Sequence, residues 1–270
     1  MRDLLHIKWL VDTGERLNSV DGKVIEIWEF QYQNDNKALS EWATHFRNHY
    51  CLDSEIDTLR SGTGKTRKQY LLDIKLPDEK KKPGPSIRAG DFAEILVADY
   101  LEFICNYWVP RLRYFDKTIK NESPKGSDVI GFKITQAEES SPNDEMIIFE
   151  VKAAFTKSNG NTLQRAVTDS AKDEIRISES LNALKQKLVV RLNSQHTKKI
   201  ERFQNIIDYP YQEKSGAAAV LEKYVFDKLT FSKTITSSHY NQDCLSLIVV
   251  KGKDMMPLVH DLYRRVADEA

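Results

Sequence analysis

Two charged side chains interrupt an apolar strand near the middle of this chain, and they restrict the possible folds more than any other feature of the sequence. The segment EMIIFEVKAAF follows GSDVIGFKI across a polar turn that contains SSPNDE. Because side chains alternate along a strand, Glu150 and Lys152 lie on one face, and Ile147, Phe149 and Val151 lie on the other. Burial of a charge costs free energy unless the charge is paired or binds a metal. The sequence therefore predicts a two-stranded hairpin whose second strand carries a functional site.

A divalent metal is the use that fits these charges best. Asp128, at the head of the first strand, and Glu150 offer carboxylate oxygens, and the backbone carbonyl between Glu150 and Lys152 offers a third oxygen. Mg²⁺ is commonly held by such ligands together with water and substrate phosphates. A metal in this position activates a bound water and neutralises charge on a phosphodiester, while the Lys152 ammonium orients that water. The alternative is an Asp in a turn and an exposed Glu and Lys on an edge strand.

The strongest helix pattern precedes the hairpin, in SIRAGDFAEILVADYLEFICN from Ser86 onward. At 3.6 residues per turn, Glu94 falls within the apolar stripe of this helix. Glu102 lies about 80° further round by the same geometry. Glu94 either extends from the edge of the stripe to solvent or faces the hairpin as a further carboxylate of the metal site.

The remaining patterns predict a mixed α/β fold in two parts. We expect residues 1–83 to form a smaller N-terminal α+β region that ends at the linker PDEKKKPGP, and residues 84–270 to form the main domain with a helical C-terminal extension. Strands are expected in LLHIKWLV, KVIEIWEFQY, KQYLLDIKL, YWVPRLRYF and CLSLIVV. Helices are expected in NKALSEWATHFRNHYC, residues 162–193, KKIERFQNIIDY, GAAAVLEKYVFDKL and MMPLVHDLYRRVADEA.

Charge and cysteine content limit the partners and the compartment. Forty basic residues balance forty acidic ones, so a nucleic-acid surface has to be local rather than global. Three scattered cysteines and the absence of a long apolar run predict a cytoplasmic protein without disulfides or membrane spans. The residues expected to contact DNA flank the hairpin and are Lys117, Lys120, Lys125, Gln164 and Arg165. For the three lysines, the alternative is a solvated basic loop.

Two apparent motifs do not predict a site. SGTGKT resembles part of a phosphate-binding loop, but Leu59 stands where that loop needs a glycine, and no apolar strand leads into it. His45 and His49 are spaced to share a ligand on one helix face, but Phe46 replaces the glutamate of a zinc-protease helix. We therefore expect these histidines to lie on a solvated polar face.

SIRAGDFAEILVADYLE, GSDVIGFKI and FEVKAAFT, taken in this order, resemble the PD-(D/E)xK nuclease superfamily. Within it, the chain resembles the HamA family, the nuclease subunits of the bacterial Hachiman anti-phage defence system. The similarity is specific over residues 86–157, and it departs from the superfamily pattern where Ser127, instead of proline, precedes Asp128.

This resemblance implies a restriction-endonuclease-like core in residues 84–270 and a DNA nuclease with little sequence specificity. It implies Mg²⁺ as cofactor, with Mn²⁺ as a substitute, and a superfamily 2 helicase subunit of the HamB type that restrains the nuclease. Carried over by position, the catalytic residues are Glu94, Asp128, Glu150 and Lys152, and the first three bind the metal. The alternative function is a non-catalytic module of nuclease fold that tethers a partner protein to DNA.

Three tryptophans bear on the expected partner. Trp9, Trp28 and Trp42 all fall within the N-terminal region. Tryptophan is enriched at protein interfaces, so these side chains form either a surface for the partner or part of the core.

Overall fold

A six-stranded mixed sheet runs through the computed structural model, which describes residues 4–137, 139–156 and 160–270. In spatial order the strands are β1 (Leu10–Asn18), β2 (Val24–Phe30), β6 (Leu245–Gly252), β5 (Gln212–Glu222), β4 (Glu145–Ala154) and β3 (Val129–Lys133). The outer pairs β1–β2 and β4–β3 are antiparallel, and the pairs between β2, β6, β5 and β4 are parallel. The mixed α/β fold expected from the sequence is confirmed.

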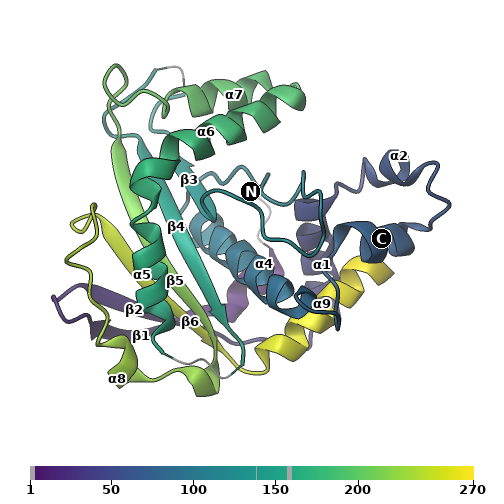
Figure 1. Cartoon of the computed structure of the whole chain (residues 1–270), viewed down its shortest axis with the longest axis horizontal. Helices are drawn as coiled ribbons and strands as arrows, with labels where there is room; N and C mark the ends of the chain where they lie inside the picture. Colours follow the sequence, from purple (N-terminus) through teal and green to yellow (C-terminus); the bar gives the residue numbers. More distant parts are fainter. Residues whose placement is uncertain (1–3, 138, 157–159) are drawn as a thin grey trace.

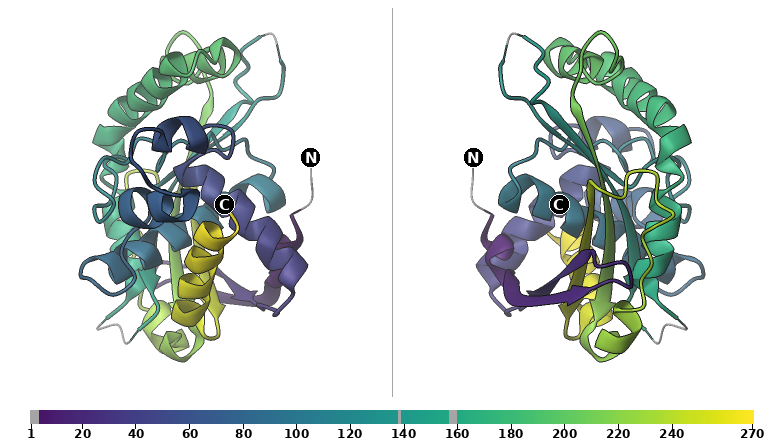
Figure 2. Two further views of the ribbon diagram at one scale, coloured as in Figure 1. Left: turned by 90° about the vertical axis from the view of Figure 1, so that its right-hand side faces the viewer. Right: turned by 90° about the vertical axis from the view of Figure 1, so that its left-hand side faces the viewer.

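Helices cover both faces of this sheet (Figure 1). One face packs against α1 (Asn36–Tyr50), α4 (Gly84–Asp99) and α9 (Met255–Asp268). The other face packs against α5 (Thr162–Ser170), and α6 (Asp173–Val190) and α7 (Ser194–Glu201) cover its β3–β4 end. Figure 2 shows these two sides from opposite directions, with α1 and α9 in front of the sheet in one view and the strands beside α6 in the other.

Short elements complete the described chain. Around the N-terminal helices these are the 3-10 helix η1 (Leu5–Trp9), α2 (Ile56–Arg60), α3 (Arg67–Tyr70) and the π-helix η2 (Leu71–Lys75). Elsewhere they are the π-helix η3 (Tyr100–Ile104), the 3-10 helix η4 (Lys223–Val225) and α8 (Lys228–Phe231). No helix within the described part of the chain combines the length and apolar composition that crossing a membrane requires.

The β3–β4 hairpin has the alternation predicted from the sequence. Ile147, Phe149 and Val151 belong to the core between the sheet and α4. Met146 and Ile148 belong to the core beneath α6, on the opposite face. Because the period of a strand is two, Glu150 and Lys152 lie on the α5–α6 side of β4.

Several predicted elements are wrong in type. KQYLLDIKL is helical, YWVPRLRYF forms only an isolated bridge between Trp108 and Phe132, and LLHIKWLV begins as a 3-10 helix before β1. GAAAVLEKYVFDKL was expected to be a helix, but its first half belongs to β5. Alanine favours helices, yet Ala217, Ala218 and Ala219 are fully buried in a parallel strand covered on both faces.

Residues 1–83 and residues 84–270 share one sheet and one core. β2 pairs with β6 in parallel, and buried side chains of α1 and α9 lie in the same apolar cluster. Trp9, Trp28 and Trp42 are buried in this cluster, so the core alternative holds and an aromatic surface for a partner is not formed by them. The boundary between the two segments stays a prediction.

Candidate active site

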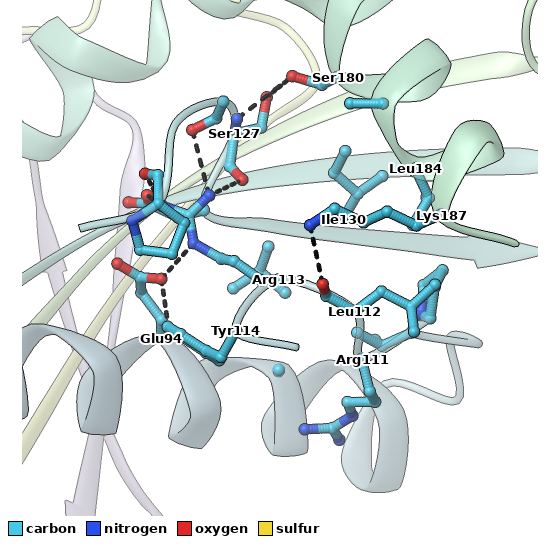
Figure 3. A pocket seen from close by; sticks show the side chains of 18 of the residues that line it. Glu94, Arg111, Leu112, Arg113, Tyr114, Ser127, Ile130, Ser180, Leu184 and Lys187 are labelled. Carbon is cyan, nitrogen blue, oxygen red and sulfur yellow. Dashed lines mark hydrogen bonds and ion pairs between the residues drawn. The ribbon is translucent and has the colours of Figure 1, made fainter. Parts of the chain in front are cut away.

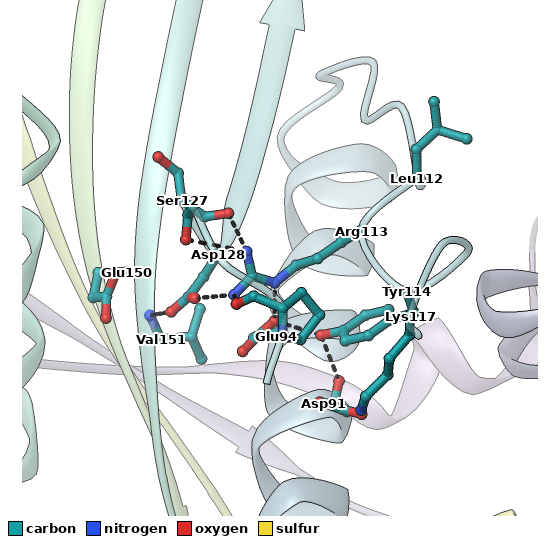
Figure 4. Close-up of polar contacts among 12 residues, drawn as sticks. Asp91, Glu94, Leu112, Arg113, Tyr114, Lys117, Ser127, Asp128, Glu150 and Val151 are labelled. Atoms are coloured by element: carbon teal, nitrogen blue, oxygen red, sulfur yellow. Dashed lines mark hydrogen bonds and ion pairs between the residues drawn. The ribbon is translucent and has the colours of Figure 1, made fainter. Parts of the chain in front are cut away.

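Helix α4 brings Glu94 close to Asp128, which directly precedes β3, and the guanidinium of Arg113 lies between the two carboxylates (Figure 4). Arg113 Nε is 2.5 Å from Glu94 Oε2, and its Nη2 is 2.6 Å from Asp128 Oδ1. Nη1 donates to the carbonyl groups of Ser127 and Gly126 at 2.5 and 3.2 Å. Arg113 is therefore an internal cation held by two acids and by the turn before β3.

Asp128 also connects this pair to β4. Its Oδ2 accepts a hydrogen bond of 3.0 Å from the backbone N–H of Val151, the residue between Glu150 and Lys152. Figure 4 shows Asp128 between Glu94 on one side and Glu150 on the other. The hairpin register thus aligns the acid before β3 with the charged residues of β4.

Glu150 and Lys152 form an ion pair on the far side of Asp128. Lys152 Nζ is 2.5 Å from Glu150 Oε1 and 2.8 Å from Oδ2 of Asp169, a residue of α5. Glu150 is only 8% exposed. The interpretation of Glu150 and Lys152 as exposed on an edge strand is excluded, because β4 lies between β5 and β3.

Two carboxylates of this site, those of Glu94 and Glu150, have raised pKa values. Burial, followed by the charge of Asp128, raises the pKa of Glu94 to about 8. The same two causes raise the pKa of Glu150 to about 7. Desolvated acids that repel one another are stabilised by any cation that enters between them.

The donor set fits a hard divalent cation. Glu94, Asp128 and Glu150 supply carboxylate oxygens, which Mg²⁺ prefers. Arg113 already stands in for a cation between Glu94 and Asp128. Only one group among the described residues brings three ligand atoms within 4.8 Å of one another, and it does not include these acids. A metal bound by all three therefore requires these side chains to approach one another, and it competes with Arg113 for Glu94 and Asp128.

A cavity of about 580 Å³ opens beside this site, between the 109–114 segment and α6. Figure 3 shows Glu94 and Arg113 at one end and Leu184 and Lys187 of α6 across from them. Lys187 Nζ donates to the carbonyl of Leu112 at 3.0 Å, which ties the two walls together. Five basic side chains line the cavity: Arg111, Arg113, Lys125, Arg176 and Lys187.

The residues predicted to contact DNA have different environments. The side chain of Lys117 is 3% exposed and its Nζ lies 2.8 Å from Asp91 Oδ2, so in this conformation it is not available to a phosphate. Lys120 is paired with Asp78 at 2.7 Å. Lys125 lines the cavity.

The two residues predicted from α5 also differ. The side-chain amide of Gln164 bonds both the N–H and the carbonyl of Ile235. Arg165 is exposed. Of the five predicted contacts, Lys125 and Arg165 are thus the ones whose charges face open space.

Sequence reasoning missed Arg113 and Asp169. The sequence did contain a signal for Arg113. Arg111 and Arg113 interrupt the apolar run WVPRLRYF, just as Glu150 and Lys152 interrupt the apolar strand MIIFEVKAAF. No comparable signal existed for Asp169, which is an ordinary polar residue of an amphipathic helix. Its proximity to Lys152 follows only from the packing of α5 on β4.

Comparison with protein families places the chain beside a known family. A family model described as HamA matches residues 5–266. No curated protein matches the chain.

Proposed function

Because this chain belongs to the HamA family, and is therefore a component of Hachiman defence, we propose that it is a metal-dependent DNA nuclease with little sequence specificity. The observation that carries this proposal is the convergence of Glu94, Asp128 and the Glu150–Lys152 pair from α4, the start of β3 and the middle of β4. Acids and a lysine in this arrangement are suited to phosphodiester hydrolysis.

In this proposal Asp128, Glu150 and Glu94 hold the metal, with Mg²⁺ as the resident ion and Mn²⁺ as a substitute. When bound, the ion supplies an activated water and neutralises charge that develops on the phosphate. Lys152 orients the attacking water and donates a hydrogen bond to the developing charge. Asp169 positions Lys152 by accepting a hydrogen bond from its ammonium group, which is 2.8 Å away.

The cavity beside the site is the proposed path of the DNA backbone. Phosphate binding depends on Lys and Arg side chains that displace counterions. Apart from Arg111 and Arg113, which are held by buried acids, the cationic lining residues are Lys125, Arg176 and Lys187, the last of which lies 3.7 Å from the exposed Asp116. We assign the backbone contacts to these three in place of the paired Lys117 and Lys120.

The alternative function is a non-catalytic module that tethers a partner protein to DNA. The ion pairs of Arg113 and Lys152 favour it, because each of the three acids already has a cationic partner without any metal. The two functions differ in what happens to DNA: a nuclease cleaves it, whereas a tether binds and leaves it intact.

Incubation of the purified chain with supercoiled plasmid, with and without Mg²⁺ or Mn²⁺, distinguishes the two. We expect cleavage only with metal, and a fall of about 100-fold or more in rate for Glu150→Gln and Lys152→Ala. Glu179→Gln is the matched control, since Glu179 is an exposed carboxylate that lines the same cavity. Wild-type cleavage by Glu150→Gln in Mg²⁺ would show that the site is assigned wrongly.

We further propose that a superfamily 2 helicase subunit of the HamB type restrains this nuclease. A DNase with little sequence specificity would cleave its host's own DNA if it were always active. The proposal follows from family membership and from this physiological requirement.

A further inference from the structure

A second group of ligand-type side chains lies between α1 and the end of α4, apart from the candidate active site. The expectation of a solvated face for His45 and His49 is wrong, because His49 is 4% exposed and His45 is partly buried. Both rings turn inward toward Asp99, the last residue of α4, which is fully buried. The helix spacing of four residues brings the two histidines to the same carboxylate.

The separations of the ligand atoms match those around a tetrahedral metal ion. His45 Nε2 is 3.5 Å from His49 Nε2 and 2.9 Å from Asp99 Oδ1. All three ligand atoms lie within 4.8 Å of one another. Two ligands of a tetrahedral Zn²⁺ with bonds near 2.0–2.1 Å are about 3.3 Å apart. The separation of the two imidazole nitrogens, 3.5 Å, is thus close to the distance between two ligands of one ion.

An outer partner holds the carboxylate in orientation. His6 Nε2 is 3.0 Å from Asp99 Oδ2, the oxygen that does not face His45, and the His6 ring stacks on Trp42. Metal-binding side chains are usually fixed by such outer contacts.

Arg111 occupies the remaining side of the cluster. Its Nη1 is 2.8 Å from Asp99 Oδ1 and 3.4 Å from His49 Nε2. Its Nη2 lies 2.5 Å from Glu102. Glu102 is therefore able to retain the guanidinium when Nη1 gives up Asp99. Arg111 and His49 both line the 580 Å³ cavity, which gives an ion a route to this position.

We propose that His45, His49 and Asp99 form a second metal site, which takes a transition-metal ion of the Zn²⁺ type in exchange for the Nη1 group of Arg111. Two imidazoles and one carboxylate select Zn²⁺ over Mg²⁺, because imidazole is a poor ligand for hard ions. The ion joins α1 to the point where α4 continues as the π-helix η3. It thereby fixes the helix that carries Glu94, and its role is structural.

Zinc binding by the tag-free chain tests this site directly. The protein carries Asp128→Asn and Glu150→Gln, so that ions at the candidate active site do not contribute, and it is titrated with Zn²⁺ after treatment with a chelator. We expect one equivalent of tightly bound Zn²⁺, a loss of more than about 100-fold in affinity for His49→Ala, and a loss of about 10–100-fold for His6→Ala. Arg111→Met is expected to bind Zn²⁺ more tightly. His260→Ala is the control, a histidine of α9 outside the cluster.

Two results would overturn the proposal: no Zn²⁺ bound by the chain or by Arg111→Met, or equal affinity in His49→Ala and its parent. If His49→Ala does not fold, the Co²⁺ form of the parent decides the question. Intense visible absorption of a tetrahedral, nitrogen-ligated Co²⁺ supports the site, and the weak absorption of an octahedral ion contradicts it.

Discussion

Arg113 occupies the position between two acids of the candidate site where a metal ion would bind. Its guanidinium forms ion pairs with both Glu94 and Asp128, and Lys152 forms one with Glu150. A metal ion that binds these acids has to compete with Arg113, so the affinity for the metal is reduced by the free energy of the contacts that Arg113 loses. The Arg113 side chain thus lowers the affinity of the site for a metal ion.

Arg113→Ala is expected to destabilise the metal-free chain and to increase its response to metal. Removal of one partner from a buried ion pair typically costs about 3–5 kcal/mol, because the remaining charges are left uncompensated. Mg²⁺ or Mn²⁺ then replaces the missing cation and stabilises the folded state by binding to it. Thermal unfolding with and without metal measures both effects.

Arg176→Ala is the control for this comparison, since Arg176 lines the same cavity. We expect its melting temperature to respond to metal as the wild type does. An equal metal-induced shift in Arg113→Ala and the wild type would mean that Arg113 does not compete with the ion.

Asp173 predicts a pH dependence of stability. Burial raises its pKa from 3.8 to about 6, although Ser127 donates a hydrogen bond to its Oδ1. Its Oδ2 has no hydrogen-bond partner among the described residues. Between about pH 4 and pH 6 the folded state binds more protons than the unfolded state, so stability falls as pH rises through this window.

Asp173→Asn removes this titration. The melting temperature of the variant minus that of the wild type is expected to increase from pH 4 to pH 6 and to remain constant above it. Asp208→Asn, at an exposed position, is the control and should show a constant difference. A difference for Asp173→Asn that does not change with pH would contradict the raised pKa.

At the scale of elements, the packing of β5 against β4 determines where Glu150 lies. A Cβ atom on Gly216 would lie 2.3–2.4 Å from ring atoms of Phe149, the residue that pairs with Gly216 and precedes Glu150. The Phe149 ring is 1% exposed and has little space to move. Glycine is therefore required at this position of the strand.

Gly216→Ala is expected to lower the free energy of unfolding by about 1–3 kcal/mol, the usual cost of overpacking. Gly90→Ala is the matched control, because a Cβ there meets nothing within 4 Å and the residue lies inside α4. That change should stabilise the chain by about 0.8–1 kcal/mol. Denaturant titrations of both variants test the pair, and equal stabilities would contradict the packing argument.

The sequence predicted correctly those helices and strands in which the spacing of apolar residues matches the faces that are buried in the fold. The helices α1, α4 and α9 have an apolar face for the core, and the hairpin β3–β4 alternates as a strand with two covered faces should. β5 was missed because an alanine-rich segment has helical propensity, and only its place between β4 and β6 makes it a strand.

The candidate site was predictable only in part. Glu94, Asp128, Glu150 and Lys152 interrupt apolar patterns and so attract attention in the sequence. Asp169 and the Arg113 bridge arise from contacts between segments far apart in the chain, which periodicity does not encode. The same holds for the approach of Asp99 to His45, across 54 residues.

At the scale of the whole molecule, the sheet connects the N-terminal segment to the candidate site. β2 pairs with β6, β6 with β5, and β5 with β4, which carries Glu150. α1 and α4 share the core on one face of this sheet. Strand pairing thus connects the N-terminal segment to the strand that carries Glu150.

The last prediction concerns a partner, and it rests on the proposed nuclease activity. A superfamily 2 helicase subunit is expected to form a stable complex with this chain and to lower its DNase rate, since an unrestrained nuclease would damage host DNA. The buried tryptophans do not supply the contact surface. Co-expression with the neighbouring gene product, followed by size-exclusion chromatography at micromolar concentration, tests the complex, and plasmid cleavage compares bound and free chains. Glu150→Gln is the control, because it should bind the partner normally while cleaving nothing. Separate elution of the two proteins, or equal DNase rates for the bound and free chain, would show that restraint does not come from this partner.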